Sequence, residues 1–143
     1  MSAMGLLLAA GCGGPDGGPE EALRAWVTRG EEAAENKDRG ELMEMISPAY
    51  SDARGNSRAD IGNMLRLYFL RQDSIALVTR IDEMTVHDGT AADLALQIGM
   101  AGTDGRLLGF DADAYRMEME LQLDGDNWRL ISARWGKIGE DTR

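Results

Sequence analysis

The sequence predicts an α+β domain in which helices precede a curved antiparallel sheet of about four strands. Three observations support this fold class. Apolar residues recur at helical spacing in the first half of the chain. After Gln72 they alternate with polar residues instead, which is typical of strands. Turn sequences containing Asp-Gly separate the alternating segments, and such turns are the strongest short-range signal for hairpins.

The first helix is predicted to begin at Pro19. Proline is tolerated in the first turn of a helix, and the carboxylates of Glu20 and Glu21 stabilise the positive helix end. Small and apolar residues then share one face at spacings of three and four, and residues 36–39 interrupt the pattern. The face comprises Leu23, Trp26, Val27, Gly30 and Ala34.

Two further helices are expected. The second covers residues 40–46 and ends near Ser47-Pro48, because the residue before a proline avoids helical geometry. Residues 52–56 are predicted to form a loop. Ser57 and Asp60 then match a capping box that opens the third helix. The apolar stripe of this helix comprises Ile61, Met64, Leu65, Tyr68 and Phe69.

Strands are predicted over residues 75–86, 91–101, 114–123 and 128–135. The third strand shows the alternation best, since one face is apolar and the other polar, which fits an antiparallel sheet with one wet face. Its apolar face carries Tyr115, Met117, Met119, Leu121 and Leu123, and its polar face carries Arg116, Glu118, Glu120 and Gln122. The apolar side of the second strand carries Ala92, Leu94, Leu96, Ile98 and Met100.

The first strand is less regular. Strict alternation places Arg80 and Asp82 on one face with Val78, Met84 and Val86. Either the two charged residues form a buried pair, or a β-bulge turns them outward, and the bulge is the more common outcome. Arg134, near the end of the last strand, is expected to contact carboxylates on a neighbouring strand. Residues 102–113 are expected to be an irregular, exposed connection, with closure over a pocket by the Asp111-Ala112-Asp113 segment as the alternative.

This order of elements resembles the nuclear transport factor 2-like, or SnoaL-like, α+β cone. The resemblance covers residues 19–138 and is carried by PEEALRAW at 19–26, by segments 42–50 and 61–70, and by the hairpin DGDNWRLISARW at 124–135. It implies a curved sheet that wraps the helices and leaves a conical pocket. The family includes dehydratases, isomerases and cyclases, but also scaffolds and binding modules, so the fold does not settle the function.

In such a cone, large aromatic side chains form the core, and some of them are expected to line the pocket with a few polar groups. The candidate pocket residues are Trp26, Tyr50, Tyr68, Tyr115 and Trp128. The hydroxyls of Tyr50 and Tyr115 are the expected polar groups. The resemblance also implies that the open sheet face can serve a homodimer, although charged residues on that face weaken this expectation.

The sequence predicts no catalytic residue, metal site or cofactor. Its single histidine, His87, is next to Asp88-Gly89 in a predicted turn, where a side chain is usually solvated. Met43 and Met45 lie two residues apart on a helix and therefore point apart, and Met117 and Met119 fit ordinary core packing better than a copper site. No nucleophile elbow, phosphate loop or metal-ligand spacing is present.

The N-terminus resembles a bacterial lipoprotein signal peptide. A short apolar run ends in small residues before Cys12, and it is too short to span a bilayer. We therefore expect a signal peptide over residues 1–11, an acylated Cys12 opening a glycine-rich tether over residues 12–18, and one domain over residues 19–139. Residues 1–4 lack the usual positive charge, and a frayed terminus with a free thiol is the alternative. Gly13 after the cysteine favours the outer membrane.

Composition agrees with an exported globular domain. The 132 residues from position 12 to position 143 suffice for one domain, and the net charge of −10 disfavours nucleic acid as a partner. We expect a lipid-anchored, periplasm-facing module of the cell envelope that holds a small apolar ligand in the cone, or else an envelope protein, without catalysis. One alternative is an acid–base enzyme of the isomerase or dehydratase type that acts on a hydrophobic substrate. Another is a structural lipoprotein whose pocket is filled by its own side chains.

Overall fold

The computed structural model describes residues 18–103 and 110–138. Three helices precede four strands, as the sequence predicts. The helices are α1 (Gly18–Glu35), α2 (Arg39–Glu44) and α3 (Arg58–Arg71). The strands are β1 (Ser74–His87), β2 (Ala91–Thr103), β3 (Phe110–Asp124) and β4 (Asn127–Lys137).

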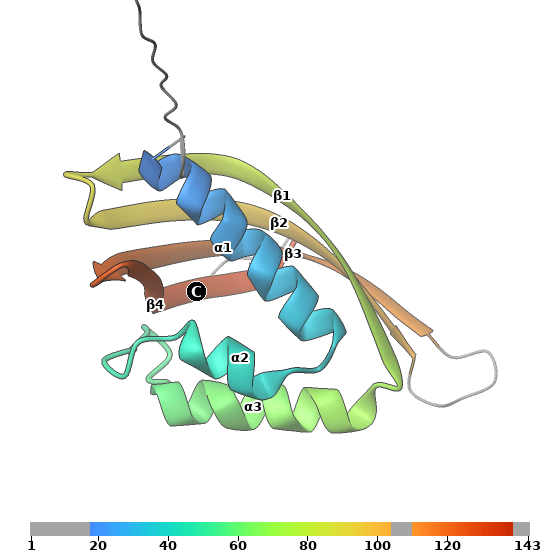
Figure 1. The fold of residues 1–143 in the computed structure, drawn as a ribbon. Helices are drawn as coiled ribbons and strands as arrows, with labels where there is room; N and C mark the ends of the chain where they lie inside the picture. The colour runs from blue at the N-terminus through green and yellow to red at the C-terminus, as the bar shows by residue number, and fades with distance from the viewer. Residues whose placement is uncertain (1–17, 104–109, 139–143) are drawn as a thin grey trace, which may run out of the picture.

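The strands form one antiparallel sheet in the order β1-β2-β3-β4. The sheet curves, α1 crosses its concave face, and α2 and α3 lie beside one another beyond β4 (Figure 1). This is an α+β architecture, an unclosed cone with helices inside the curve of the sheet. The core lies between α1 and the concave face, where Leu23 of α1 and Leu121 of β3 are fully buried.

Local sequence explains the helix boundaries. The predicted capping box is present, because the Ser57 side chain accepts a hydrogen bond from the backbone N–H of Asp60 and the Asp60 carboxylate accepts one from the N–H of Ser57. The second helix is shorter than predicted. It ends at Glu44 because Ile46 leaves the helix to form a parallel bridge with Leu130 of β4.

The apolar stripe of α3 is less buried than its pattern predicts. Only Gly62 is fully buried in this helix, and Met64 is 41% exposed. Leu67 and Leu70, outside the predicted stripe, are exposed as well. The reason is position: α3 lies at the edge of the molecule and contacts α2, while α1 occupies the centre of the sheet.

A β-bulge in β1 resolves the position of the Arg80–Asp82 pair. The register with β2 shifts between Ile81 and Glu83, so one extra residue reverses the alternation. Strict alternation, which placed Val78 and Arg80 with Met84, is therefore wrong for the first half of the strand. Val78 is 74% exposed on the outer face. Arg80 Nε donates to Asp82 Oδ1 at 3.0 Å, on the outer side of the sheet.

The connection between β2 and β3 is more regular than predicted. Strand pairing continues to Gly102 opposite Asp111 and to Thr103 opposite Phe110, so the described residues of the segment 102–113 are strand backbone. Pairing satisfies backbone N–H and C=O groups that an irregular loop would leave to water, which explains the extension. The predicted turn at Asp104-Gly105 lies outside the described residues.

The predicted signal peptide, the lipid attachment site Cys12 and the tether up to residue 17 also lie outside the described residues. Gly18, which we assigned to the tether, is the first residue of α1. In the part of the chain that the structure describes, no helix is long and apolar enough to cross a membrane.

Candidate binding site

A cavity of about 280 Å³ lies between the three helices and the concave face of the sheet. Its wall is almost wholly apolar. The helices contribute Trp26, Val27, Gly30, Glu31, Ala34, Leu42, Ile61 and Leu65, and Met45 and Ile46 follow α2. The sheet contributes Leu77, Thr79, Leu96, Ile98, Met100, Met117, Met119 and Leu130. This is the conical pocket that the resemblance implies.

Gly30 opens the cavity on the α1 side. A Cβ atom built at this glycine would lie 3.4 Å from Cε of Met45, so the missing side chain leaves room next to the pocket. Four methionines, Met45, Met100, Met117 and Met119, line the same space. Their flexible thioether side chains fit irregular shapes, which suits a wall that adapts to different apolar molecules.

Two polar side chains, Glu31 and Thr79, occur among the described residues of the wall. The Thr79 hydroxyl donates a hydrogen bond of 2.6 Å to Oε2 of Glu31. One turn further along α1, Glu35 Oε2 accepts a 2.9 Å hydrogen bond from the backbone N–H of Leu77. The two carboxylates therefore join α1 to β1, and Glu31 does so at the cavity wall.

Sequence reasoning missed both polar residues. Glu31 lies four residues after Val27 and three before Ala34, so it interrupts the predicted apolar face of the first helix, and that interruption was the available signal. Thr79 was hidden by the bulge in β1. Strict alternation directs it outward, whereas the register shift places it on the helix side.

The five predicted pocket residues separate into two groups. Trp26 lines the cavity, and its indole N–H donates to the carbonyl of Trp128 at 3.1 Å. The described wall does not include Tyr50, Tyr68, Tyr115 or Trp128. Tyr50 and Trp128 are buried in the core, whereas Tyr68 and Tyr115 are half-buried.

Tyr50 belongs to a separate hydrogen-bonded loop. Its hydroxyl donates to Oδ2 of Asp52 at 2.7 Å, and the backbone N–H groups of Arg54 and Asn56 donate to Oδ1 of the same carboxylate at 3.0 Å. Burial, and then the hydrogen bond to Asp52, raise the pKa of Tyr50 above its ordinary value. Partial burial opposes ionisation of Asp52, but the hydrogen bonds it accepts outweigh that effect and lower its pKa.

Arg54 fastens this loop to the last strand. Its guanidinium donates to the carbonyl of Trp135 at 2.6 Å and lies 4.6 Å from the centroid of the Trp135 ring. The Tyr50–Asp52–Arg54 group therefore stabilises the loop after α2.

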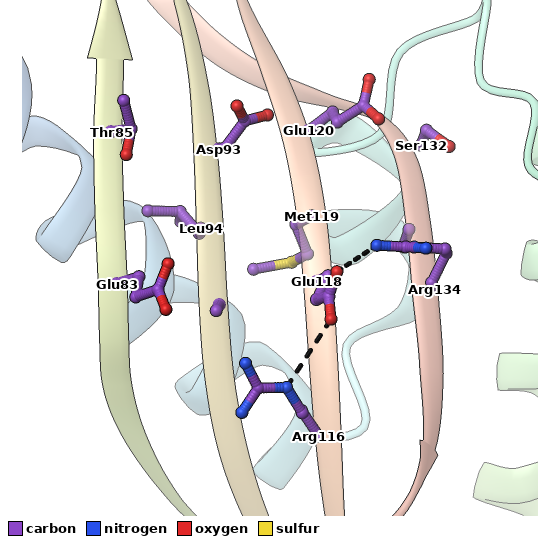
Figure 2. A pocket seen from close by; sticks show the side chains of 12 residues that line it. Glu83, Thr85, Asp93, Leu94, Arg116, Glu118, Met119, Glu120, Ser132 and Arg134 are labelled. Atoms are coloured by element: carbon purple, nitrogen blue, oxygen red, sulfur yellow. Dashed lines mark hydrogen bonds and ion pairs between the residues drawn. The ribbon is translucent and has the colours of Figure 1, made fainter. Parts of the chain in front are cut away.

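The outer face of the sheet carries a second hollow, of about 390 Å³. Figure 2 shows Glu118 of β3 at its centre, with Arg116 and Arg134 directed toward it. Arg116 Nε lies 3.6 Å from Glu118 Oε2, and Arg134 also bonds Glu118. The expected contact of Arg134 with a neighbouring carboxylate is thus confirmed. The small side chain of Ala95 leaves room at the floor of the hollow, and Glu83, Asp93 and Glu120 also line it.

The remaining chemistry-bearing residues of the sequence have ordinary surroundings. His87 is exposed, and its Nε2 lies 2.9 Å from Oδ2 of Asp93. Met117 and Met119 point to the helix side, as core packing predicts. Within the described residues, no group of three or more His, Cys, Asp or Glu side chains is placed to hold a metal ion.

Comparison with known proteins connects this geometry to one fold. No protein-family model and no curated protein matches the chain. Among solved structures, a nuclear transport factor 2-like superfamily protein from Salmonella enterica serovar Typhimurium LT2 aligns with a TM-score of 0.70 at 13% identity, over 86% of this chain and 96% of that one. The chain has the nuclear transport factor 2-like fold.

Proteins with this fold and different activities superpose equally well. A ketosteroid isomerase-like protein from Erwinia carotovora aligns with a TM-score of 0.66 at 11% identity, over 83% of this chain and 95% of that one. A type 2 hexachlorocyclohexane dehydrochlorinase aligns with a TM-score of 0.70 at 6% identity, over 87% and 88%. At such identities the nuclear transport factor 2-like fold is shared, and activity has to be argued from the cavity itself.

Proposed function

We propose that this protein is a binding module that holds a small apolar ligand in the cavity between its helices and its sheet. The observation that carries the proposal is the composition of the wall, which is apolar apart from Glu31 and Thr79. Pockets for small molecules have this character, with a mostly hydrophobic lining and a few polar groups that fix orientation. The volume of about 280 Å³ suits a ligand of modest size.

The cavity, which is partly open to solvent, is also larger than the voids left by ordinary packing. Protein interiors are close-packed, and their voids rarely exceed the size of a water molecule. Each empty volume lowers stability because the side chains around it lose their contacts. Apolar cavities of about half this volume stay dry and bind small hydrocarbons. Occupation by an apolar ligand would restore contacts to the surrounding methionines and leucines.

Native mass spectrometry of the full chain, purified from its own cells without denaturation, tests the proposal. A reproducible added mass is expected on the wild-type protein. The matched variant Gly30→Leu places a side chain in the cavity, next to the flexible end of Met45, and should lose that mass while keeping the far-ultraviolet circular dichroism of a folded chain. Bare protein mass in both samples would contradict the proposal.

Proton transfer by Glu31 is the second candidate function, because a carboxylate at the wall of an apolar cavity can act as a general base. Among the described residues of the wall it has no second titratable partner, which favours binding over catalysis. Incubation of 2-octanone with the protein in D₂O separates the two functions. Deuterium incorporation next to the carbonyl that is fast with wild type and absent with Glu31→Gln would establish the catalytic alternative.

We further propose that the module is anchored by lipid at Cys12 and faces the periplasm, with the outer membrane favoured. The support is the sequence alone: the apolar run, the small residues before the cysteine, and the glycine-rich tether after it. Cells that express the protein with a labelled palmitate analogue should incorporate the label, and Cys12→Ser should abolish it and release the protein from the membrane fraction. Equal labelling of the two proteins would contradict lipidation.

We also propose that a protein partner binds at the outer hollow, either a second copy of this chain or another envelope protein. Its mixture of carboxylates and guanidinium groups offers polar complementarity and no apolar ligand pocket. If a second copy binds here, sedimentation velocity should show a dimer for the wild type and a monomer for Ala95→Arg, whose long side chain would fill the floor. A wild-type monomer at all concentrations would leave an envelope protein as the remaining candidate.

A further inference from the structure

We propose that the ligand of the cavity carries a hydrogen-bond donor at one end, with an amine preferred to a hydroxyl and a carboxylate excluded. This inference rests on the proposed function, because it concerns the same cavity. It assigns the recognition of the polar end of the ligand to Glu31. The argument depends on counting which hydrogen-bonding atoms of the wall remain available.

The two polar side chains of the described wall, Glu31 and Thr79, offer hydrogen-bond acceptors to a ligand. An ionised carboxylate accepts hydrogen bonds at both of its oxygens and donates none, and the bond from Thr79 occupies only part of the capacity of Glu31. The Thr79 hydroxyl has a single proton, which it donates to Glu31 at 2.6 Å. Its oxygen is therefore left as an acceptor as well. A ligand that meets these two side chains must bring the proton itself.

The side-chain donor of the described wall is already engaged. The indole N–H of Trp26, which lines the cavity, donates to the carbonyl of Trp128 at 3.1 Å. The backbone N–H of Leu77 donates to Glu35 at 2.9 Å. The other side chains of the described wall are hydrocarbon or thioether and provide no hydrogen-bond donor. A carboxylate or ketone on the ligand would thus lose its hydrogen bonds to water and gain none from these groups.

The negative charge of the protein also favours an amine as the ligand. The chain has a net charge of −10, and Glu31 and Glu35 follow one another on the inner side of α1. An anionic ligand would approach a negative protein and then meet a carboxylate at the cavity wall, whereas a cationic amine is attracted at both stages. Hydrogen bonds to charged groups are also stronger than neutral ones. An amine should therefore bind more tightly than an alcohol of the same length.

Three eight-carbon probes test the inference on the full chain: octylamine, 1-octanol and octanoate at pH 7, measured by isothermal titration calorimetry. We expect octylamine to bind most tightly and octanoate at least about tenfold more weakly than octylamine. Glu31→Gln should weaken octylamine by about tenfold and change 1-octanol by less than about threefold. Glu35→Gln is the matched control, because Glu35 lies one turn away outside the described wall and should leave the order of affinities unchanged.

The outcomes separate the inference from the proposed function. If octanoate binds as tightly as octylamine, or if Glu31→Gln keeps the full preference for the amine, the inference is wrong while the cavity remains a ligand site. If none of the three probes binds, both fail. Should Glu31→Gln not fold, Thr79→Val offers a second variant, which removes the bond to Glu31 but not the carboxylate and should retain the preference for the amine.

Discussion

At the residue scale, hydrogen-bonding partners decide what each polar side chain can do. Tyr50 was a candidate polar group of the pocket, yet its proton is donated to Asp52 and its ring is buried in the core. Glu31, which interrupts the predicted apolar face of the first helix, lies at the cavity wall. Tyr50 is therefore absent from the described cavity wall, where it was expected, and Glu31 is present there, where it was not. An aromatic hydroxyl stabilises a loop, and a charged residue lies at the wall of an apolar cavity.

The loop carboxylate makes stability depend on pH. Hydrogen bonds lower the pKa of Asp52 in the folded state. The ionised carboxylate therefore stabilises the fold above the pKa that Asp52 has in the unfolded chain, and this stabilisation is lost as the pH falls through its pKa in the folded state. We expect the free energy of unfolding of Asp52→Asn to be about 1 kcal/mol lower than that of the wild type at pH 7. The difference from wild type should shrink below about pH 4.

Urea unfolding at several pH values measures this effect. The matched control is Asp126→Asn, which changes an exposed carboxylate in the turn between β3 and β4 and should alter stability little at any pH. A wild-type advantage over Asp52→Asn that persists unchanged well below pH 4 would show that the carboxylate charge is not its source.

At the scale of elements, the sequence predicts the order and type of all seven helices and strands, because each has its own periodicity and its own boundary signals. It does not predict which way a strand faces once the alternation breaks. The charged pair Arg80 and Asp82 indicates a bulge in β1, but residues 74–87 taken alone do not show where the extra residue lies. Its position turns Thr79 to the cavity and Val78 to the outside. The sequence also does not predict how deeply a helix is buried, since α3 has a helical apolar stripe and still lies at the edge of the molecule.

Helix α1 provides a direct test of how the cavity is formed. Glycine in a helix interior is less favourable than alanine by about 1 kcal/mol, and Gly30 lies in α1 beside the cavity. A Cβ there would meet only the flexible end of Met45, at 3.4 Å. Gly30→Ala should therefore stabilise the protein by up to about 1 kcal/mol in urea unfolding. A clear loss of stability would mean that this wall of the cavity is closely packed.

At the scale of the whole molecule, the cavity depends on how α1 crosses the curved sheet. The apolar faces of α1 and of the sheet can each be predicted from sequence, but the space left between them depends on their mutual placement, which no local pattern encodes. The same curve separates two environments. The inner face encloses an apolar cavity with a carboxylate in its wall, and the outer face carries mixed charges (Figure 2).

The central claim is that the inner cavity is an open site for a small apolar molecule, and methionine methyl resonances test it most directly. Four of the nine methionines line the cavity, namely Met45, Met100, Met117 and Met119, whereas Met64 is exposed on α3. In a protein with ¹³C-labelled methionine methyl groups, 1-octanol should shift the four cavity resonances along one saturable curve and leave Met64 unchanged. Unchanged cavity resonances at saturating 1-octanol, or shifts at Met64 alone, would contradict the account.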